Sequence, residues 1–125
     1  ARNAATLLHG DFWPGNVLWD AGRIAAVIDW EEAAFGDPLH DLGISRLDML
    51  WAYGEPASQA FTAAYAKAAP HVDLAGLPWF DLAAALRPAG QISRWAAIAD
   101  DPREKAQHMR ERHALFRDRA LASLG

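Results

Sequence analysis

The sequence changes character once, at Pro38, and this change constrains the fold more than any other feature. Before Pro38, short apolar runs alternate with Gly, Pro, Asp and Asn, a pattern typical of short strands joined by turns. After Pro38 the chain is rich in Ala and Leu, which favour helix. The chain has 125 residues and no linker or internal repeat, a length that suits one domain. We therefore predict a single domain over residues 1–125 with an α+β, mainly α, fold.

Turn and breaker residues set the expected element boundaries. Residues 17–28 are expected to form a two-stranded β-ribbon, with Gly22 at positive φ in its loop. Prolines and an acidic N-cap divide the rest into a bundle of about four helices. These helices are expected over residues 39–53, 56–69, 78–98 with a break at Pro88 and Gly90, and 101–123. The last helix is expected to turn Ala106, Met109, Phe116 and Ala120 inward.

Composition excludes several classes of protein. Twelve Lys and Arg against sixteen Asp and Glu give a net charge of −4, so the basic face of a nucleic-acid-binding protein is not expected. No apolar run approaches the roughly 18 residues of a membrane helix. The chain has no cysteine, which rules out disulfides, thiolate zinc sites and thiol catalysis. This composition suits a reducing cytosol, and we expect a cytoplasmic protein.

The last helix carries two histidines and many arginines. His108 and His113 are five residues apart and so lie on different sides of a helix, whereas a pair of metal-binding histidines usually lies four apart on one face. A zinc site is therefore not expected, and both histidines are expected to face solvent. The Arg-rich run over residues 103–119 is likewise expected to be a solvated helix face.

The residues that carry chemistry lie beside the expected strands. Asp11 follows a strand-like run, Asn16 comes five residues later, and Asp29 follows the ribbon. Phosphoryl transfer requires positioning and cancellation of phosphate charge, which Mg²⁺ supplies. Mg²⁺ prefers oxygen ligands and typically takes one or two protein carboxylates together with phosphate oxygens. Asp29 and the amide oxygen of Asn16 suit that role, and Asp11 is left to accept the hydroxyl proton and aim the nucleophile.

Residues 9–43 resemble the aminoglycoside phosphotransferase and choline kinase-like family, which are small-molecule relatives of the protein kinases. The letters HGD at 9–11 with Asn16 are similar to the family's HGDxxxxN loop, and IDW at 28–30 is similar to the segment that replaces DFG. GDP at 36–38 and DL at 41–42 follow in the same order. The resemblance implies a partial C-terminal lobe of a protein kinase-like fold, in which the ribbon carries the catalytic loop and the metal-binding Asp.

The resemblance also implies roles for individual residues. Asp11 is expected to be the catalytic base, and Asn16 and Asp29 are expected to bind Mg²⁺ and, through it, the co-substrate ATP. Asp41 is expected to be a structural carboxylate that supports the catalytic loop. His9 is expected to be a buried histidine that bonds the backbone near the loop rather than a proton carrier.

The acceptor is expected to be a small molecule with a hydroxyl group, and a cationic one such as an aminoglycoside suits the acidic balance of the chain. Trp13 and Trp30 flank the expected site and are candidates for stacking on the substrate, although aromatic residues there are more often core. Glu31 and Glu32 follow the metal-binding Asp and are candidates for binding a cationic group. The simpler interpretation is that they lie on a solvated surface or form an ion pair. The spacing of the later acidic residues singles out none of them; these are Asp48, Glu55, Asp81, Asp100 and Asp101.

Parts of the kinase template have no counterpart in the sequence. The template needs a Gly-rich loop and a Lys paired with a helix Glu, whereas this chain has no GxGxxG, and its lysines, Lys67 and Lys105, fall in expected helices. Few residues precede His9, and the first residue is not Met. We therefore expect a truncated chain without the N-terminal nucleotide lobe. An apolar face left exposed in this way predicts a homo-oligomer, a domain swap or a partner that supplies the lobe.

The sequence is compatible with two alternative functions from different classes. The first is an incomplete ATP-dependent phosphotransferase of the aminoglycoside phosphotransferase type, connected with antibiotic resistance and expected to be inactive without the missing lobe; choline, homoserine or sugar kinases are alternatives within this class. The second is a non-catalytic remnant or interaction module that keeps the helical scaffold.

Overall fold

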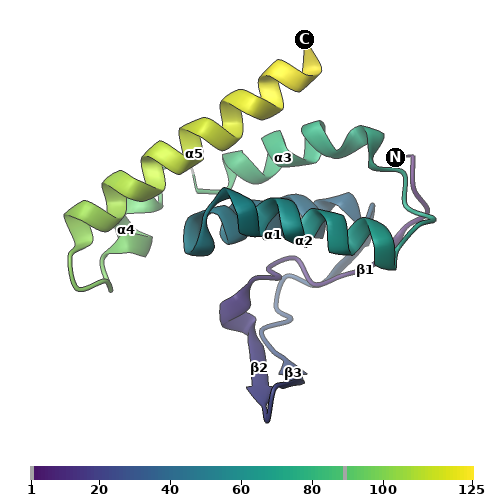
Figure 1. Cartoon of the computed structure of the whole chain (residues 1–125), viewed down its shortest axis with the longest axis horizontal. Coiled ribbons are helices and arrows are strands. Elements are labelled where there is room, and N and C mark those ends of the chain that lie inside the picture. The colour runs from purple at the N-terminus through teal and green to yellow at the C-terminus, as the bar shows by residue number, and fades with distance from the viewer. Residues whose placement is uncertain (1, 89) are drawn as a thin grey trace.

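The computed structural model describes residues 2–88 and 90–125, and in this part of the chain two small antiparallel sheets precede a group of helices (Figure 1). The predicted α+β, mainly α, fold is confirmed. The strands are β1 (Thr6–Leu8), β2 (Val17–Asp20), β3 (Arg23–Val27) and β4 (Ala34–Gly36). The α-helices are α1 (Leu39–Tyr53), α2 (Glu55–Ala68), α3 (Leu77–Leu86), α4 (Ile92–Ala96) and α5 (Pro102–Leu124). Short 3-10 helices cover Pro14–Asn16 and Leu74–Gly76.

Strands β2 and β3 form the predicted ribbon, which projects from the helical part at the bottom of Figure 1. Val17 pairs with Val27 at its base, and Asp20 pairs with Arg23 beside the loop. Both loop residues have positive φ, 44° at Ala21 and 77° at Gly22, as a tight two-residue hairpin of the primed type requires. The positive φ predicted for Gly22 is confirmed, and the same conformation at Ala21 is unusual for a residue with a side chain.

The second sheet was not predicted from the sequence. Strand β1 pairs antiparallel with β4, with Thr6 opposite Gly36 and Leu8 opposite Ala34. Each strand has three residues, too few for an alternating pattern to identify. The pairing matters because residue 9 follows β1 directly, while α1 begins shortly after β4. It therefore brings the loop that starts at His9 to the first turns of α1.

The helices pack around a core that α1, α3 and α5 share. α1 contributes Ile44, Leu47, Leu50 and Trp51. Gly43 allows the backbones of α1 and α3 to approach, because a Cβ there would lie 2.8 Å from the carbonyl oxygen of Phe80. The four α5 residues expected to point inward are buried, which confirms the predicted face: Ala106, Met109, Phe116 and Ala120.

The third expected helix is two helices in the structure. α3 ends at Leu86 and α4 begins at Ile92, so the break predicted at Pro88 and Gly90 separates the elements completely. Gly90 has a φ of 77°, a left-handed conformation that no regular right-handed helix contains.

Two residues of α5 that were expected to face solvent bond to other helices instead, which corrects the sequence reading. Arg112 Nη1 donates to the carbonyl oxygens of Leu50 and Trp51 at 2.6 and 2.9 Å. Nε2 of the half-buried His113 lies 2.6 Å from the carbonyl oxygen of Ala85. These carbonyls belong to the last turns of α1 and α3, where carbonyl groups run out of partners within the helix; that of Leu50 also accepts the N–H of Gly54, the residue after α1. Side-chain donors from a neighbouring helix bond to them. The spacing of charges along α5 does not indicate these hydrogen bonds.

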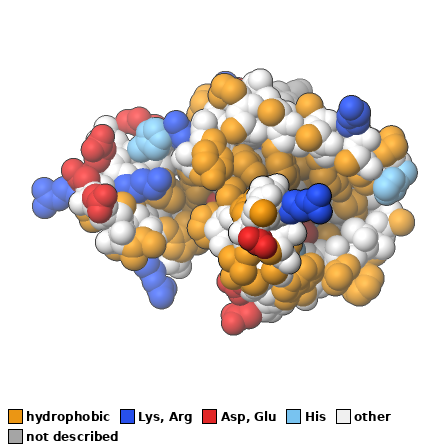
Figure 2. Space-filling view, turned by 60° about the horizontal axis from the view of Figure 1, so that its bottom comes forward, with side chains coloured by type: hydrophobic (Ala, Val, Ile, Leu, Met, Phe, Trp, Pro, Cys, Tyr) orange, Lys and Arg blue, Asp and Glu red, His pale blue; other side chains and the backbone are white. Residues whose placement is uncertain are grey.

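Large apolar side chains are exposed across the strand-containing third. Phe35 is 79% exposed and Trp19 is 64% exposed. Figure 2 shows hydrophobic side chains spread over the face that includes the β2–β3 hairpin. Exposed apolar side chains also occur on the helices, such as Trp79 and Leu86 of α3, and the expected uncovered face stays a prediction. Among the described residues, no helix is long and apolar enough to cross a membrane.

Candidate active site

Helix α1 holds the loop of residues 9–16 by its first two turns. The Asp41 carboxylate accepts hydrogen bonds from the backbone N–H groups of His9 and Gly10, at 2.6 and 2.9 Å. One turn later, Ser45 Oγ donates to the carbonyl oxygen of Phe12 at 2.7 Å. Asp41 and Ser45 are four residues apart and so lie on one face of the helix. The loop is thus fixed through its backbone at three positions, and its side chains remain free for other contacts.

His9 ties the loop to the segment that carries Asp29. Its ring is buried, with 3% of the residue exposed. Nδ1 accepts the backbone N–H of Asp11 at 3.2 Å, and Nε2 lies 2.8 Å from the carbonyl oxygen of Ile28. Because a carbonyl can only accept, Nε2 must carry the proton, and the imidazole is the neutral tautomer. The ring also packs on Trp30, with 4.5 Å between centroids.

Gly10 lets the loop cross the segment that follows β3. Its φ is +85°, and a Cβ there would lie 2.8 Å from Cβ of Glu32. Both the backbone conformation and the close crossing exclude a side chain at this position. The glycine between His9 and Asp11 is therefore required by the path of the chain.

Asn16 is turned toward Asp11. The Asn16 side chain is buried, and Nδ2 donates to the carbonyl oxygen and to Oδ2 of Asp11, at 2.9 and 3.2 Å. Because Nδ2 is committed to these bonds, the orientation of the amide is fixed. Within the described residues, Oδ1 of Asn16 accepts no hydrogen bond from the protein and is available to a ligand.

Asp29 follows the ribbon at the point where its two strands meet the loop. The N–H of Ile28 donates to the carbonyl oxygen of Asn16 at 2.9 Å, directly after the pair of Val17 and Val27. The φ of Asp29 is 64°, a left-handed conformation that Asp tolerates better than most residues. Such strained residues cluster at functional sites. The side chain is exposed and forms no ion pair within the described residues.

Arg87 is a site residue that the sequence reading missed. It follows α3, and its Nη2 donates to Oδ1 of Asp11 at 3.2 Å and to Oε2 of Glu32 at 3.3 Å. Arg87 lies 76 residues from Asp11 along the chain, so no local spacing could have indicated the pair. The contact of Ser45 with the loop could have been predicted, because Ser45 lies one turn after Asp41 on the same face of its helix.

A cavity of about 540 Å³ opens beside Asp11 and Arg87. Helices α1, α3, α4 and α5 contribute to its wall, together with the loop. Its aromatic wall comes from Trp13, Trp51 and Trp95. Its charged groups are three carboxylates and two cations: Asp11, Glu32, Asp48, Arg87 and Lys105. A cavity of this size with few polar groups is typical of a small-molecule site.

Of the acidic residues after the motif, Asp48 is the one that lines this cavity. Burial raises the pKa of the Asp48 carboxyl to about 7, while the Arg87 guanidinium opposes the rise and the charge of Asp11 adds to it. The sequence offered no reason to prefer Asp48. Glu55 and Asp81 are paired with arginines, and Asp101 caps α5.

The raised pKa of Asp48 predicts a pH-dependent stability that Asp48→Asn should remove. The folded protein keeps a proton up to about pH 7 that the unfolded chain loses near a pKa of about 4. The stabilisation from this proton is complete below the pKa of the unfolded chain and is lost as the pH rises through the pKa of the folded protein. Between about pH 5 and about pH 8, the wild type should lose roughly 2 to 3 kcal/mol relative to the variant. Urea unfolding at both pH values measures the difference, and Asp20→Asn on the exposed hairpin is the control. If the stability of the wild type and of Asp48→Asn changed equally with pH, the prediction would be contradicted.

The four substrate candidates lie in different surroundings. The structure brings Trp13 and Glu32 to the cavity wall. Trp30 packs on His9 and donates from Nε1 to the carbonyl oxygen of Val27 at 2.8 Å. Trp30 and Glu31 are both exposed and are not among the residues that line the cavity.

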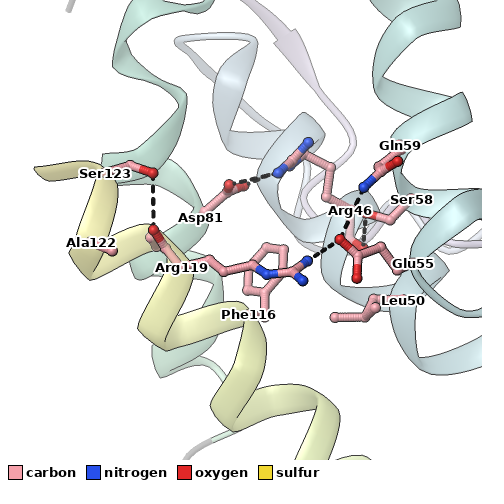
Figure 3. Close-up of a pocket in the computed structure, with 11 residues that line it drawn as sticks. Arg46, Leu50, Glu55, Ser58, Gln59, Asp81, Phe116, Arg119, Ala122 and Ser123 are labelled. Carbon is pink, nitrogen blue, oxygen red and sulfur yellow. Dashed lines mark hydrogen bonds and ion pairs between the residues drawn. The ribbon is translucent and has the colours of Figure 1, made fainter.

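A second hollow, of about 400 Å³, lies between α1, α2, α3 and α5 (Figure 3). Its charged groups face one another: Arg46 pairs with Asp81, and Arg119 pairs with Glu55. Its lining residues include neither Asp11 nor Arg87. These pairs hold the helices together.

The anchored loop carries Asp11 to the wall of a cavity, with the amide and carboxylate oxygens of Asn16 and Asp29 beside it. The model of the phosphotransferase enzyme family matches residues 1–80. The chain therefore belongs to the phosphotransferase enzyme family. This confirms the family expected from the motif.

Similar proteins are matched over short stretches. Hygromycin-B 4-O-kinase of Escherichia coli is 58% identical over 36 residues, which are 29% of this chain and 11% of that protein. Viomycin phosphotransferase of Streptomyces vinaceus is 40% identical over 42 residues, 30% of this chain and 15% of that protein. Acyl-CoA dehydrogenase family member 11 of Rattus norvegicus is 41% identical over 51 residues, 39% of this chain and 6% of that protein. The matches thus span a small part of each relative, and no solved structure matches the chain.

Proposed function

We propose that the protein transfers the γ-phosphoryl group of ATP to a hydroxyl group of a small molecule, with Asp11 as the catalytic base. The observation that carries this proposal is the setting of the Asp11 carboxylate. It lies at the wall of a cavity large enough for a small acceptor, on a loop whose backbone α1 anchors. Membership of the phosphotransferase family supports the reaction type.

The residues around Asp11 fit a bound Mg²⁺. Asn16 presents a free amide oxygen, because its nitrogen is committed to Asp11, and Asp29 presents an exposed carboxylate. Two oxygen ligands from the protein are typical for Mg²⁺, which usually completes its shell with waters and phosphate oxygens. When bound, the ion would supply positive charge to the phosphate oxygens of ATP.

The chemical step then requires little from the protein beyond positioning and a proton acceptor. The acceptor hydroxyl oxygen forms a bond to the γ-phosphorus, the bond between this phosphorus and the bridging oxygen of ADP breaks, and the hydroxyl proton passes to Asp11. Asp41 and Ser45 hold the loop so that the Asp11 carboxylate keeps its position during this transfer. His9, with both ring nitrogens bonded, supports the loop and moves no proton.

We propose a cationic acceptor of the aminoglycoside type, which would connect the protein with antibiotic resistance. The aromatic wall of the cavity, formed by Trp13, Trp51 and Trp95, favours a cationic group that can lie over a ring face. The names of two relatives, a hygromycin-B kinase and a viomycin phosphotransferase, support such acceptors. Choline, homoserine and sugars are the competing acceptors within the same reaction class.

The nucleotide-binding groups are proposed to come from a lobe outside these residues. The exposed apolar side chains of the strand-containing third, such as Phe35 and Trp19, supply a face for such a lobe, for an exchanged segment or for a second copy. The proposed use of ATP supports a cytoplasmic location.

A transfer assay tests the proposed function. The full-length protein is incubated with Mg²⁺, γ-labelled ATP and, separately, hygromycin B, viomycin, choline, homoserine and glucose. We expect labelled product with at least one cationic acceptor. Asp29→Ala should lower the rate on the order of 100-fold, because a metal contributes several kcal/mol of charge stabilisation, whereas Asp20→Ala on the same ribbon should not. Failure of every acceptor would favour a non-catalytic interaction module, and an active Asp29→Ala would remove Asp29 from the metal site.

A further inference from the structure

Both oxygens of the Asp11 carboxylate are held by side chains. Asn16 Nδ2 donates to Oδ2 and Arg87 Nη2 donates to Oδ1, each at 3.2 Å. The two donors approach from opposite parts of the chain, because Asn16 belongs to the loop itself and Arg87 follows α3. Together they fix the rotation of the carboxylate about its Cβ–Cγ bond, which neither donor could do alone.

Arg87 is held in turn by Glu32. The same Nη2 that bonds Asp11 lies 3.3 Å from Oε2 of Glu32, and Glu32 belongs to the segment that Gly10 crosses. The guanidinium therefore joins three parts of the fold at one point: the loop, the segment after β3 and the end of α3. All three side chains line the cavity beside Asp11.

Stability alone does not account for this arrangement. The side chains of Arg87 and Asp11 are 30% and 31% exposed, and that of Glu32 is 64% exposed. Ion pairs in such partly hydrated positions contribute little to folding. Their geometric effect is larger, because a displacement of about 1 Å at a reacting group can cost on the order of 100-fold in rate.

We propose that Arg87 is a positioning residue for the phosphoryl transfer, and that Glu32 acts through Arg87 to keep the Asp11 carboxylate aimed at the cavity. The inference rests on the proposed function for its consequence in catalysis, while its structural part can be tested without any activity. Glu32, considered from the sequence as a contact for a cationic substrate, takes a different role here, because its carboxylate is engaged by Arg87.

The structural part is tested by NMR on the side-chain amide of Asn16 in the full-length protein. This amide donates to Asp11, so its resonance reports the orientation of the carboxylate. Asn16 is one of two asparagines in these 125 residues, and the signal that an Asn16→Gln variant loses identifies its resonance in the full-length protein. Arg87→Met and Glu32→Gln should each shift the resonance. Arg119→Met, which breaks the ion pair with Glu55 in the second hollow, should leave it in place.

The catalytic part is tested by the kinetics of the same variants, with the acceptor found in the transfer assay. Arg87→Met should lower kcat roughly 10- to 100-fold. It should leave KM for ATP within about twofold, because the substitution does not change the protein groups proposed to bind the nucleotide. Arg87→Lys should recover part of the loss. Glu32→Gln should lower kcat less, and the double variant should be no slower than Arg87→Met. Arg119→Met should retain the wild-type rate.

An unshifted Asn16 resonance in Arg87→Met, or a kcat within about twofold of the wild type, would overturn the proposal. An additive loss in the double variant would overturn the part assigned to Glu32. If the resonance shifts but the wild type phosphorylates none of the acceptors, the positioning of Asp11 is supported and the proposed function is what fails.

Discussion

Asp11→Asn is expected to lower kcat for phosphoryl transfer by roughly 10²- to 10⁴-fold, the contribution of a positioned general base. Asparagine has the shape of aspartate and keeps an oxygen that can accept from Arg87 or Asn16, so the loop should retain its path. It cannot accept the hydroxyl proton. The loss should therefore fall on kcat and leave KM for ATP nearly unchanged, as steady-state kinetics on the full-length protein would show.

The matched control is Asp118→Asn. Asp118 is exposed on α5 and pairs with its neighbour Arg117, so the same change of charge there should leave kcat unaltered. Equal melting temperatures for the two variants would show that any difference between them is chemical. A kcat for Asp11→Asn within about threefold of the wild type would contradict the assignment of Asp11 as the base.

Asp81→Ala is expected to destabilise the fold by about 3 kcal/mol or more. Asp81 in α3 is buried, and its two oxygens accept from Nε and Nη2 of Arg46 in α1 at 2.9 and 3.0 Å (Figure 3). Arg46 also donates to Thr62 and lies over the Phe116 ring. Removing Asp81 leaves a largely buried guanidinium without its counter-charge, which is the costly way to break such a pair. Urea unfolding measures the change.

The double variant Arg46→Leu/Asp81→Leu separates the cost of an unpaired charge from the value of the pair. Burial raises the pKa of the Asp81 carboxyl and Arg46 only partly offsets the rise, so the pair is held against a desolvation cost. Replacing both partners by apolar side chains should therefore restore much of the stability lost in Asp81→Ala. A double variant as unstable as the single one would mean that the pair itself, with its contacts to Thr62 and Phe116, supplies the stability.

Local signals carried much of the fold prediction. Helix α1 begins and ends at the predicted residues, and Asp101 caps α5 by accepting from the N–H groups of Arg103 and Glu104. These boundaries depend on a few neighbouring residues, which a sequence displays directly. The β1–β4 pair depends on two short segments about thirty residues apart, and neither has enough residues to show a period.

The candidate site divides in the same way. Asp11, Asn16 and Asp29 stand out because their types and spacing suit a metal-assisted phosphoryl transfer. Arg87 and Asp48 do not, because each is an ordinary helix-associated residue until the packing of α3 and α1 brings it to the cavity. The bonds that Arg112 and His113 make to α1 and α3 have no signal in the sequence for the same reason.

The sequence by itself determined the family, the loop that carries Asp11, the β2–β3 ribbon and the helical character of the chain after Pro38, because these follow from residue types at short separations. The tertiary structure alone decided which charges lie near Asp11, since Arg87, Glu32 and Asp48 come to the same cavity from three separate parts of the chain. It also decided that Gly10 and Gly43 must lack side chains, because backbones from distant segments pass beside them. Contacts between distant segments depend on how whole elements pack, and a single sequence does not display that packing.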